Sequence, residues 1–255
     1  MQSELTKKRG LNKWWLQLIA IAAMLADHAA VLSPLASVYY ILKLIGRITI
    51  VIMCYFIAEG YHKTSSIPKY IMRMGIFAAI SQIPYYLYIY HGRIPTNING
   101  LLMFLFTYRN VIFTLFIGLV LLAIVKSGYN LFIKLVSCVA ALYLVRSSDW
   151  GYYVILWVIG CGLFYGSKKK QLIWMSAIIA LRIAFMAVTP VIGIIETRTL
   201  AYATLYNWLA QFGGFLAIPL LAMYNGEKGR DSKLSLYLFY PIHIIVIVLL
   251  WTLIY

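Results

Sequence analysis

The sequence predicts an all-α fold: a polytopic integral membrane protein with about nine transmembrane helices in a single domain, residues 1–255. Hydrophobic residues make up 63% of the chain and charged residues 11%, whereas soluble domains are roughly half apolar and about a quarter charged. The mean hydropathy is +0.85. Apolar stretches of about 20 residues, the length that crosses a bilayer, recur along the whole chain with short connections.

The apolar stretches define the expected spans in chain order. The second span contains Lys43 and Arg47, the seventh contains Arg182, and the fifth and sixth are short. Residues 91–109 are expected to be partly re-entrant, and residues 189–203 are candidates for an interfacial helix. We expect the nine spans at about residues 14–34, 38–58, 70–90, 105–125, 130–147, 151–166, 171–188, 204–223 and 235–255.

Lysine and arginine are unevenly distributed among the connections. The net charge of +15 would indicate nucleic acid as a partner of a soluble protein, but here the positive-inside rule explains the basic loops. With a cytoplasmic N-terminus, the outer loops carry only Arg93, Arg109, Arg146 and Arg198. The inner segments then carry Lys7, Lys8, Arg9, Lys13, Lys63, Lys69, Arg73, Lys126, Lys168, Lys169, Lys170, Lys228, Arg230 and Lys233. We therefore expect a multi-pass protein of the cell membrane with its N-terminus inside and its C-terminus outside.

Familiar soluble-enzyme motifs do not occur in the sequence. There is no His-Glu-x-x-His, Walker loop, Gly-x-Ser-x-Gly or Gly-x-Gly-x-x-Gly pattern, and the histidines are too scattered for a metal signature. Cys54, Cys138 and Cys161 lie in apolar runs and are expected to be packing residues. No internal repeat is visible, which argues against an inverted-repeat transporter.

Asp27 and His28 interrupt the first apolar span. His28 lies about 21 Å along that helix from its inner end, which is still within a hydrocarbon core about 30 Å thick. Arg47 lies about 14 Å from the outer end of the returning second helix, so Asp27 and Arg47 can meet, with Lys43 one turn away. Buried polar groups usually mark a pathway or site in membrane proteins. The alternative is an ion pair that only joins two helices, with His28 as a bystander.

Other polar residues gather at particular spans. The inner end of the second span has Glu59, His62, Lys63 and Thr64, and the fourth span has Asn110 and Thr114. Asp149 follows Arg146 before the sixth span. The last span carries Tyr237, Tyr240, Pro241 and His243, where the proline removes one backbone donor and favours a kinked polar pocket. A packing role and a catalytic role are equally consistent with the position of His243.

These residues, in this order, resemble the TraX family of integral membrane proteins. The family is named for the conjugation protein that acetylates the N-terminus of F-type pilin, and it looks related to membrane acyltransferases that use cytoplasmic acetyl-CoA. The regions about 120–145 and 167–222 match poorly. The matching stretches are LIAIAAMLADH at 18–28, IGR at 45–47, FIAEGYHKT at 56–64, YIMR at 70–73, SQIP at 81–84, NVIFTLFIGL at 110–119, DWGYY at 149–153, YNGEKG at 224–229, and Lys233 leading to FYPIH at 239–243.

The resemblance implies an acetyltransferase that moves an acetyl group from acetyl-CoA, as co-substrate, to an amine or hydroxyl acceptor reached from the outer face. His28 matches the early-helix histidine that is thought to be catalytic in the larger group, so we expect it to be the general base. The other expected catalytic residues are Asp27, Arg47, His243 and Tyr240, the last two as a second-choice proton relay. Arg47, or Asn110 with Thr114, would stabilise the oxyanion. The expected CoA-binding residues are Glu59, His62, Lys63, Lys69, Arg73, Asn110, Thr114, Lys228, Arg230 and Lys233.

Two other functions stay open on the sequence alone. A transporter or flippase for a small polar or lipid-linked solute would use Asp27, Arg47 and Arg182 as its pathway. A non-catalytic partner in an envelope complex would depend on its loops. The acceptor, whether a peptide N-terminus, a small amine or a sugar, is left open, as are the acyl chain length and the oligomeric state.

Overall fold

A computed structural model describes residues 10–93, 97–100, 109–197, 202–230 and 233–255 of the chain. The described part is helical, and it contains two isolated β-bridges and no β-strand. Its elements, in chain order, are α1 (Lys13–Ala29), η1 (Ala30–Leu32), α2 (Ala36–Lys63), α3 (Ile67–Ile80), α4 (Gln82–Ile89), α6 (Val111–Lys126), α7 (Leu131–Val145), α8 (Gly151–Leu163), α9 (Lys168–Thr197), α10 (Tyr202–Ala210), η2 (Gln211–Leu216), α11 (Ala217–Ala222) and α12 (Lys233–Ile254).

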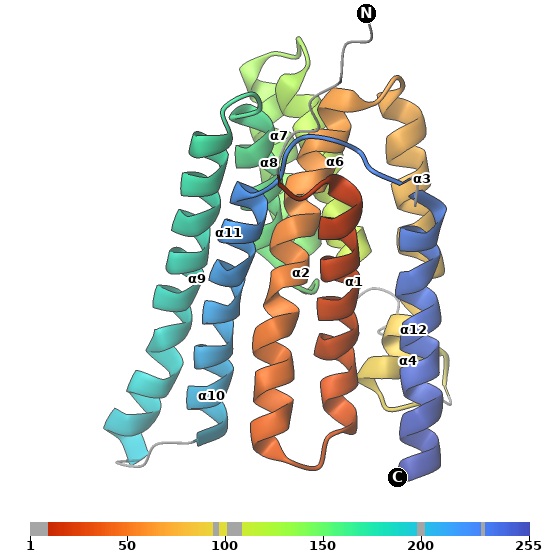
Figure 1. Ribbon diagram of the computed structural model, residues 1–255, viewed down its shortest axis with the longest axis vertical. Coiled ribbons are helices and arrows are strands. Elements are labelled where there is room, and N and C mark those ends of the chain that lie inside the picture. The colour runs from red at the N-terminus through yellow and green to blue at the C-terminus, as the bar shows by residue number, and fades with distance from the viewer. Residues whose placement is uncertain (1–9, 94–96, 101–108, 198–201, 231–232) are drawn as a thin grey trace, which may run out of the picture.

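Helices α1 and α2 form an antiparallel pair in the middle of the molecule (Figure 1). The Asn12 side chain caps α1 by accepting a hydrogen bond from the Trp15 N–H at 3.1 Å. Gly46 lets the two helices approach closely, since a Cβ atom there would lie 2.3 Å from the Cβ of Asp27. Small residues permit such close helix contacts in membrane proteins. The pair therefore fixes Asp27 and His28 against the middle of α2.

The expected spans are recovered as helices, but several are divided or have other ends. The expected span 70–90 is broken at Ser81 into α3 and α4, and the expected span 204–223 is α10, η2 and α11 in succession. Residues 189–197 continue α9 instead of forming a separate interfacial helix. Part of the predicted re-entrant segment, 94–96 and 101–108, lies outside the described residues. In the described chain, Lys13–Leu32, Ala36–Lys63, Tyr202–Ala222 and Tyr237–Ile254 are long and apolar enough to cross a membrane, and α6, α7 and α8 are shorter. The count of nine stays a prediction.

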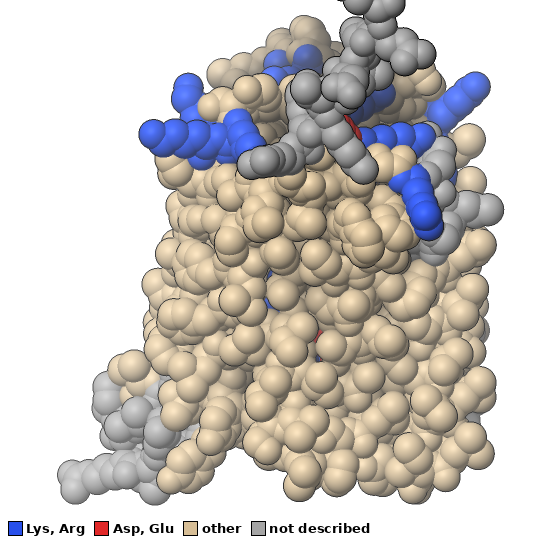
Figure 2. All heavy atoms as spheres, viewed as in Figure 1, with Lys and Arg blue, Asp and Glu red and all other residues tan. Residues whose placement is uncertain are grey.

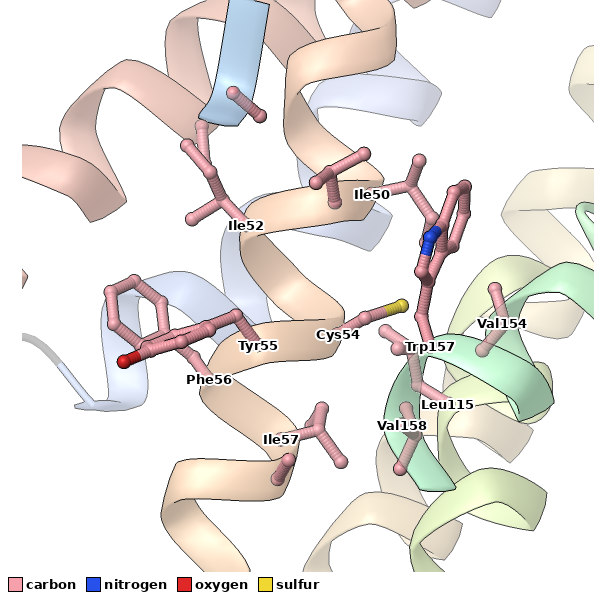
Figure 3. Close-up of a cluster of buried hydrophobic side chains, with 14 of the residues drawn as sticks. Ile50, Ile52, Cys54, Tyr55, Phe56, Ile57, Leu115, Val154, Trp157 and Val158 are labelled. Atoms are coloured by element: carbon pink, nitrogen blue, oxygen red, sulfur yellow. The ribbon is translucent and has the colours of Figure 1, made fainter. Parts of the chain in front are cut away.

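The hydrophobic core surrounds the second half of α2, where residues 50–52 and 54–58 are all buried. Figure 3 shows Ile50, Cys54 and Ile57 of α2 facing Trp157 and Val158 of α8. The Trp157 indole N–H donates to the Met175 carbonyl at 3.2 Å, which satisfies a polar group that is buried in this core. Two of the three cysteines, Cys54 and Cys161, are fully buried here, as expected for packing residues. Large apolar side chains on α7 are instead exposed, which is the pattern of a lipid-facing surface.

Charged side chains are concentrated at one end of the molecule. Figure 2 shows the Lys and Arg side chains of the visible face gathered at the end where the N-terminus lies, while the rest of that face is almost free of charge. The C-terminus lies at the opposite end (Figure 1). The molecule thus has one strongly basic end and a long apolar body.

Candidate functional site

A cavity of about 480 Å³ connects the basic end of the molecule to the polar residues in its interior. Lys13 and His28 both line this cavity, and they are separated by about 22 Å along α1 at the helical rise of about 1.5 Å per residue. The middle of the wall is apolar, with Met24, Met53 and Leu115 among its residues. We call the basic end of the cavity the mouth (Lys13, Lys63, Arg73, Lys228 and Arg230) and its other end the deep end (Asp27, His28, Asp149, Trp150 and Tyr240).

Five cationic side chains and one carboxylate line the mouth. Glu59 accepts hydrogen bonds from Lys13 at 2.9 Å and from Lys63 at 2.8 Å. Arg73 lies over the rings of Tyr70 and Tyr237, with its Cζ 5.4 Å from each centroid, and Arg230 lies over Trp14. Cations therefore exceed carboxylates at the mouth, which suits an anionic ligand.

The mouth is held together by the segment between α11 and α12. This segment crosses the beginning of α1 (Figure 1), where Leu11 N–H donates to the Met223 carbonyl and Lys13 N–H to the Glu227 carbonyl, at 2.9 and 2.8 Å. The Tyr224 hydroxyl donates to Glu59 at 2.8 Å. Burial raises the pKa of this hydroxyl, and the neighbouring Glu59 carboxylate raises it further, so Tyr224 stays a donor. These contacts place Lys228 and Arg230 beside Lys13 and Lys63.

His28 and His243 meet at the deep end. His28 Nδ1 lies 2.9 Å from the Met24 carbonyl oxygen and 3.2 Å from His243 Nε2, and His243 Nδ1 lies 2.7 Å from the Phe239 carbonyl oxygen. A carbonyl only accepts, so each Nδ1 carries a proton, and His243 Nε2 accepts from His28 Nδ1. In the neutral His28 ring Nε2 is then unprotonated, and no described residue hydrogen-bonds to it. The histidine offers a free basic nitrogen to the cavity.

Aromatic rings hold the His28 imidazole in place. The rings of Tyr88 and Tyr240 contact it edge-on, at centroid distances of 5.2 and 5.9 Å, and the Tyr88 hydroxyl donates to the His28 carbonyl at 3.3 Å. His28 is only 8% exposed and His243 only 4%. The fold brings these residues together from α1, α4 and α12. No local sequence pattern could have predicted this contact.

An ion-pair group of one carboxylate and two cations adjoins the deep end. Asp27 accepts from Lys43 at 3.3 Å and from Arg47 at 3.4 Å, and Lys43 also donates to the Asp27 carbonyl at 2.8 Å. The expected pairing of Asp27 with Arg47 and Lys43 is thus present. Asp27 makes no hydrogen bond to His28 in the described structure, where His243 and Met24 are the ring's partners instead.

Trp150 is a site residue that the sequence reasoning missed. Its backbone adopts φ +61°, an outlier for a bulky residue, and such strain concentrates at functional sites. The guanidinium groups of Arg47 and Arg182 lie 4.9 and 4.4 Å from its ring. Together with Asp149, Trp150 lines the deep end. The sequence feature that could have indicated Trp150 is the DWG stretch at 149–151, which joins the two short apolar spans.

Several residues expected in the site lie behind the cavity wall. The Asn110 side chain caps α6 and donates to the Ala78 carbonyl and to Gln82, and Thr114 donates to the Asp149 carbonyl. His62 stacks on Tyr165 and contacts the Gly162 carbonyl. Arg47 and His243 contact wall residues from behind, and Lys69 is exposed. None of these six is among the residues that line the cavity. The Lys233 side chain lies outside the described residues.

Comparison with known proteins identifies the family of this chain. The family model described as "TraX protein" matches residues 13–251, which include the whole cavity wall. The chain is 30% identical over 234 residues to "Probable fimbrial assembly protein FimC, serogroup H1" of Dichelobacter nodosus, and the alignment covers 90% of this chain and 91% of that protein. No solved structure matches the chain. The chain is a member of the TraX family of membrane proteins.

Proposed function

We propose that this protein is a membrane acyltransferase that moves an acetyl group from acetyl-CoA, bound at the mouth, to an amine or hydroxyl acceptor at the deep end. One observation carries the proposal: a single cavity joins a surplus of cations to a histidine with a free basic nitrogen. By the positive-inside rule, the basic end faces the cytoplasm, where acetyl-CoA is made, and the C-terminus lies outside.

The dimensions of the cavity support this donor. The 3′-phosphate and pyrophosphate of CoA suit Lys63, Arg73, Lys228 and Arg230 at the mouth. An extended pantetheine arm of about 15–20 Å then reaches most of the way along the roughly 22 Å between Lys13 and His28. The apolar middle of the wall contacts the arm.

The free nitrogen of His28 supports a general-base mechanism. Nε2 takes the proton of the acceptor N–H or O–H as the acceptor attacks the thioester carbon. His28 is then an imidazolium whose Nδ1–H still donates to Met24 and His243, and Asp27 on the adjacent position supplies a negative charge. When the C–S bond breaks, Nε2–H returns the proton to the CoA sulfur. The relative's name links it to fimbrial assembly, so a pilin-like polypeptide is the first acceptor to test.

The experiment is acetyl-CoA binding and turnover by the purified protein in detergent. We expect saturable hydrolysis or transfer that His28→Gln lowers by about 10²–10⁴-fold, the contribution of a positioned base, with acetyl-CoA affinity retained. His91→Asn is the matched control, because His91 is exposed, stacks on Trp251 and has a φ of 51° that asparagine tolerates. Absence of acetyl-CoA binding, or turnover that His28→Gln leaves unchanged, contradicts the proposal and favours a transporter.

A further inference from the structure

The hydroxyl of Tyr240 is buried without a hydrogen-bond partner in the described part of the chain. Tyr240 is only 2% exposed. A tyrosine hydroxyl that is buried usually finds a partner, and leaving one unmatched lowers stability. An unmatched polar group of this kind calls for an explanation, and a ligand that supplies the missing partner is one of the standard explanations.

The position of Tyr240 points to such a ligand. Tyr240 lines the cavity, and its ring contacts the ring of His28, at 5.9 Å, and that of His243, at 5.7 Å. Tyr240 therefore lies at the same end of the cavity as His28. An atom that reacts beside His28 is within the reach of both side chains.

The beginning of α6 adds a second source of positive potential. Val111 and Ile112, the first residues of this 16-residue helix, also line the cavity. A helix N-terminus carries unpaired amide groups and the positive end of the helix dipole. Negative charge that develops next to Tyr240 is stabilised by this helix end.

We propose that the Tyr240 hydroxyl, supported by the first turn of α6, is the oxyanion donor of the reaction. This inference rests on the proposed acetyl transfer. When the acceptor attacks the thioester carbon, the carbonyl π electrons move to oxygen, and Tyr240 O–H donates a hydrogen bond to that oxyanion while His28 Nε2 takes the acceptor's proton. The electrons then return to re-form C=O, the C–S bond breaks, and His28 gives the proton to sulfur.

The residues expected for this role from the sequence are engaged elsewhere. The Asn110 amide nitrogen donates to Ala78 and Gln82, and the Thr114 hydroxyl donates to Asp149. Arg47 pairs with Asp27 and lies over Trp150, and although its Nε–H is also unmatched, Arg47 is absent from the cavity wall. Tyr240 thus takes the place of these candidates, since its donor is unused and it lines the wall beside the base.

The test compares two substitutions that each remove one unmatched buried hydroxyl. Tyr240→Phe is expected to lower kcat by about 10²–10³-fold, the effect of losing one oxyanion donor, while acetyl-CoA affinity stays the same and Tm stays the same or rises. Ser81→Ala is the control, because the Ser81 hydroxyl is also buried and unmatched but is absent from the cavity wall. This control is expected to keep the wild-type kcat.

A binding measurement gives the inference a second test. Wild-type protein is expected to bind trifluoroacetonyl-CoA, whose hydrate resembles the tetrahedral intermediate, more tightly than Tyr240→Phe does, while acetonyl-CoA binds both equally. Wild-type kcat in Tyr240→Phe, or equal binding of the hydrate by both proteins, overturns the oxyanion role. Lack of acetyl-CoA turnover by the wild-type protein overturns the proposed function instead.

Discussion

The two ends of the cavity differ in how their charged groups are arranged. At the mouth, five cations meet one carboxylate, and long side chains lie at the basic surface. At the deep end, Asp27 pairs with both Lys43 and Arg47, and His243 is a neutral ring because its Nε2 accepts from His28 while its Nδ1 donates to Phe239. In the proposed function, the surplus of cations at the mouth attracts the anionic donor, and the ion-paired deep end holds the base that takes the proton.

The largest expected effect comes from removing the Asp27 carboxylate at the deep end. Asp27→Asn leaves Lys43 and Arg47 without their carboxylate in an interior position, which should destabilise the protein by about 3 kcal/mol. Glu59→Gln at the mouth should cost less, because Lys63 is half exposed and Lys13 is partly exposed, so water can replace the carboxylate as their partner. Thermal unfolding of the two variants in the same detergent measures the difference. Equal losses would contradict the contrast between the two ends.

The close contact of α1 with α2 provides the next test. Gly46→Ala places a Cβ atom against Asp27, so α1 has to move away, at a cost of about 1–3 kcal/mol for an overpacked interior. Gly128→Ala is the matched control, since its added Cβ would meet nothing within 4 Å. Thermal unfolding should separate the two variants. A stable Gly46→Ala protein with unchanged turnover would refute this account of the helix pair.

His243→Asn should produce a smaller effect on the chemical step. The substitution removes the acceptor that His243 Nε2 presents to His28 Nδ1, while the Met24 carbonyl still holds the same proton. Losing an orienting partner of this kind typically costs about 10–100-fold, so we expect a loss in kcat of that size without a change in acetyl-CoA affinity. Steady-state kinetics would show it. A kcat equal to that of wild type would make His243 a packing residue.

The mouth should show the smallest and most salt-dependent effect. Arg73→Gln is expected to weaken acetyl-CoA binding by about 10-fold at low salt, and less at high salt, because screening weakens exposed charge pairs. Lys170→Gln is the control, since Lys170 is an exposed cation at the beginning of α9 and is absent from the cavity wall. Titrations at two ionic strengths measure both variants. An equal response of the two would mean that only general surface charge matters.

The sequence was sufficient for the helical membrane fold and for part of the site. Residue depth along two antiparallel helices predicts that Asp27 meets Arg47, and their ion pair is present. Glu59 and Lys63 are one helical turn apart, so their contact is local. Such arguments succeed because a helix fixes the rise between residues on the same or on adjacent segments.

The remainder of the site depends on packing between distant segments. His28 and His243 are 215 residues apart, and their contact arises where α1 approaches α12. Hydropathy also does not distinguish one long span from α3 and α4, which separate at Ser81. Asn110 and Thr114 are polar within an apolar stretch, but the beginning of α6 uses them for capping and for the Asp149 carbonyl. Only the three-dimensional arrangement leaves Tyr240 unmatched.

The most direct test of the central claim is an experimental structure of the His28→Gln protein with acetyl-CoA, in which turnover is blocked. We expect the CoA phosphates against Arg73, Lys228 and Arg230. We expect the thioester carbon beside residue 28, with room for one acceptor atom between them. An empty cavity at saturating acetyl-CoA, or a thioester held at the mouth far from residue 28, would contradict it.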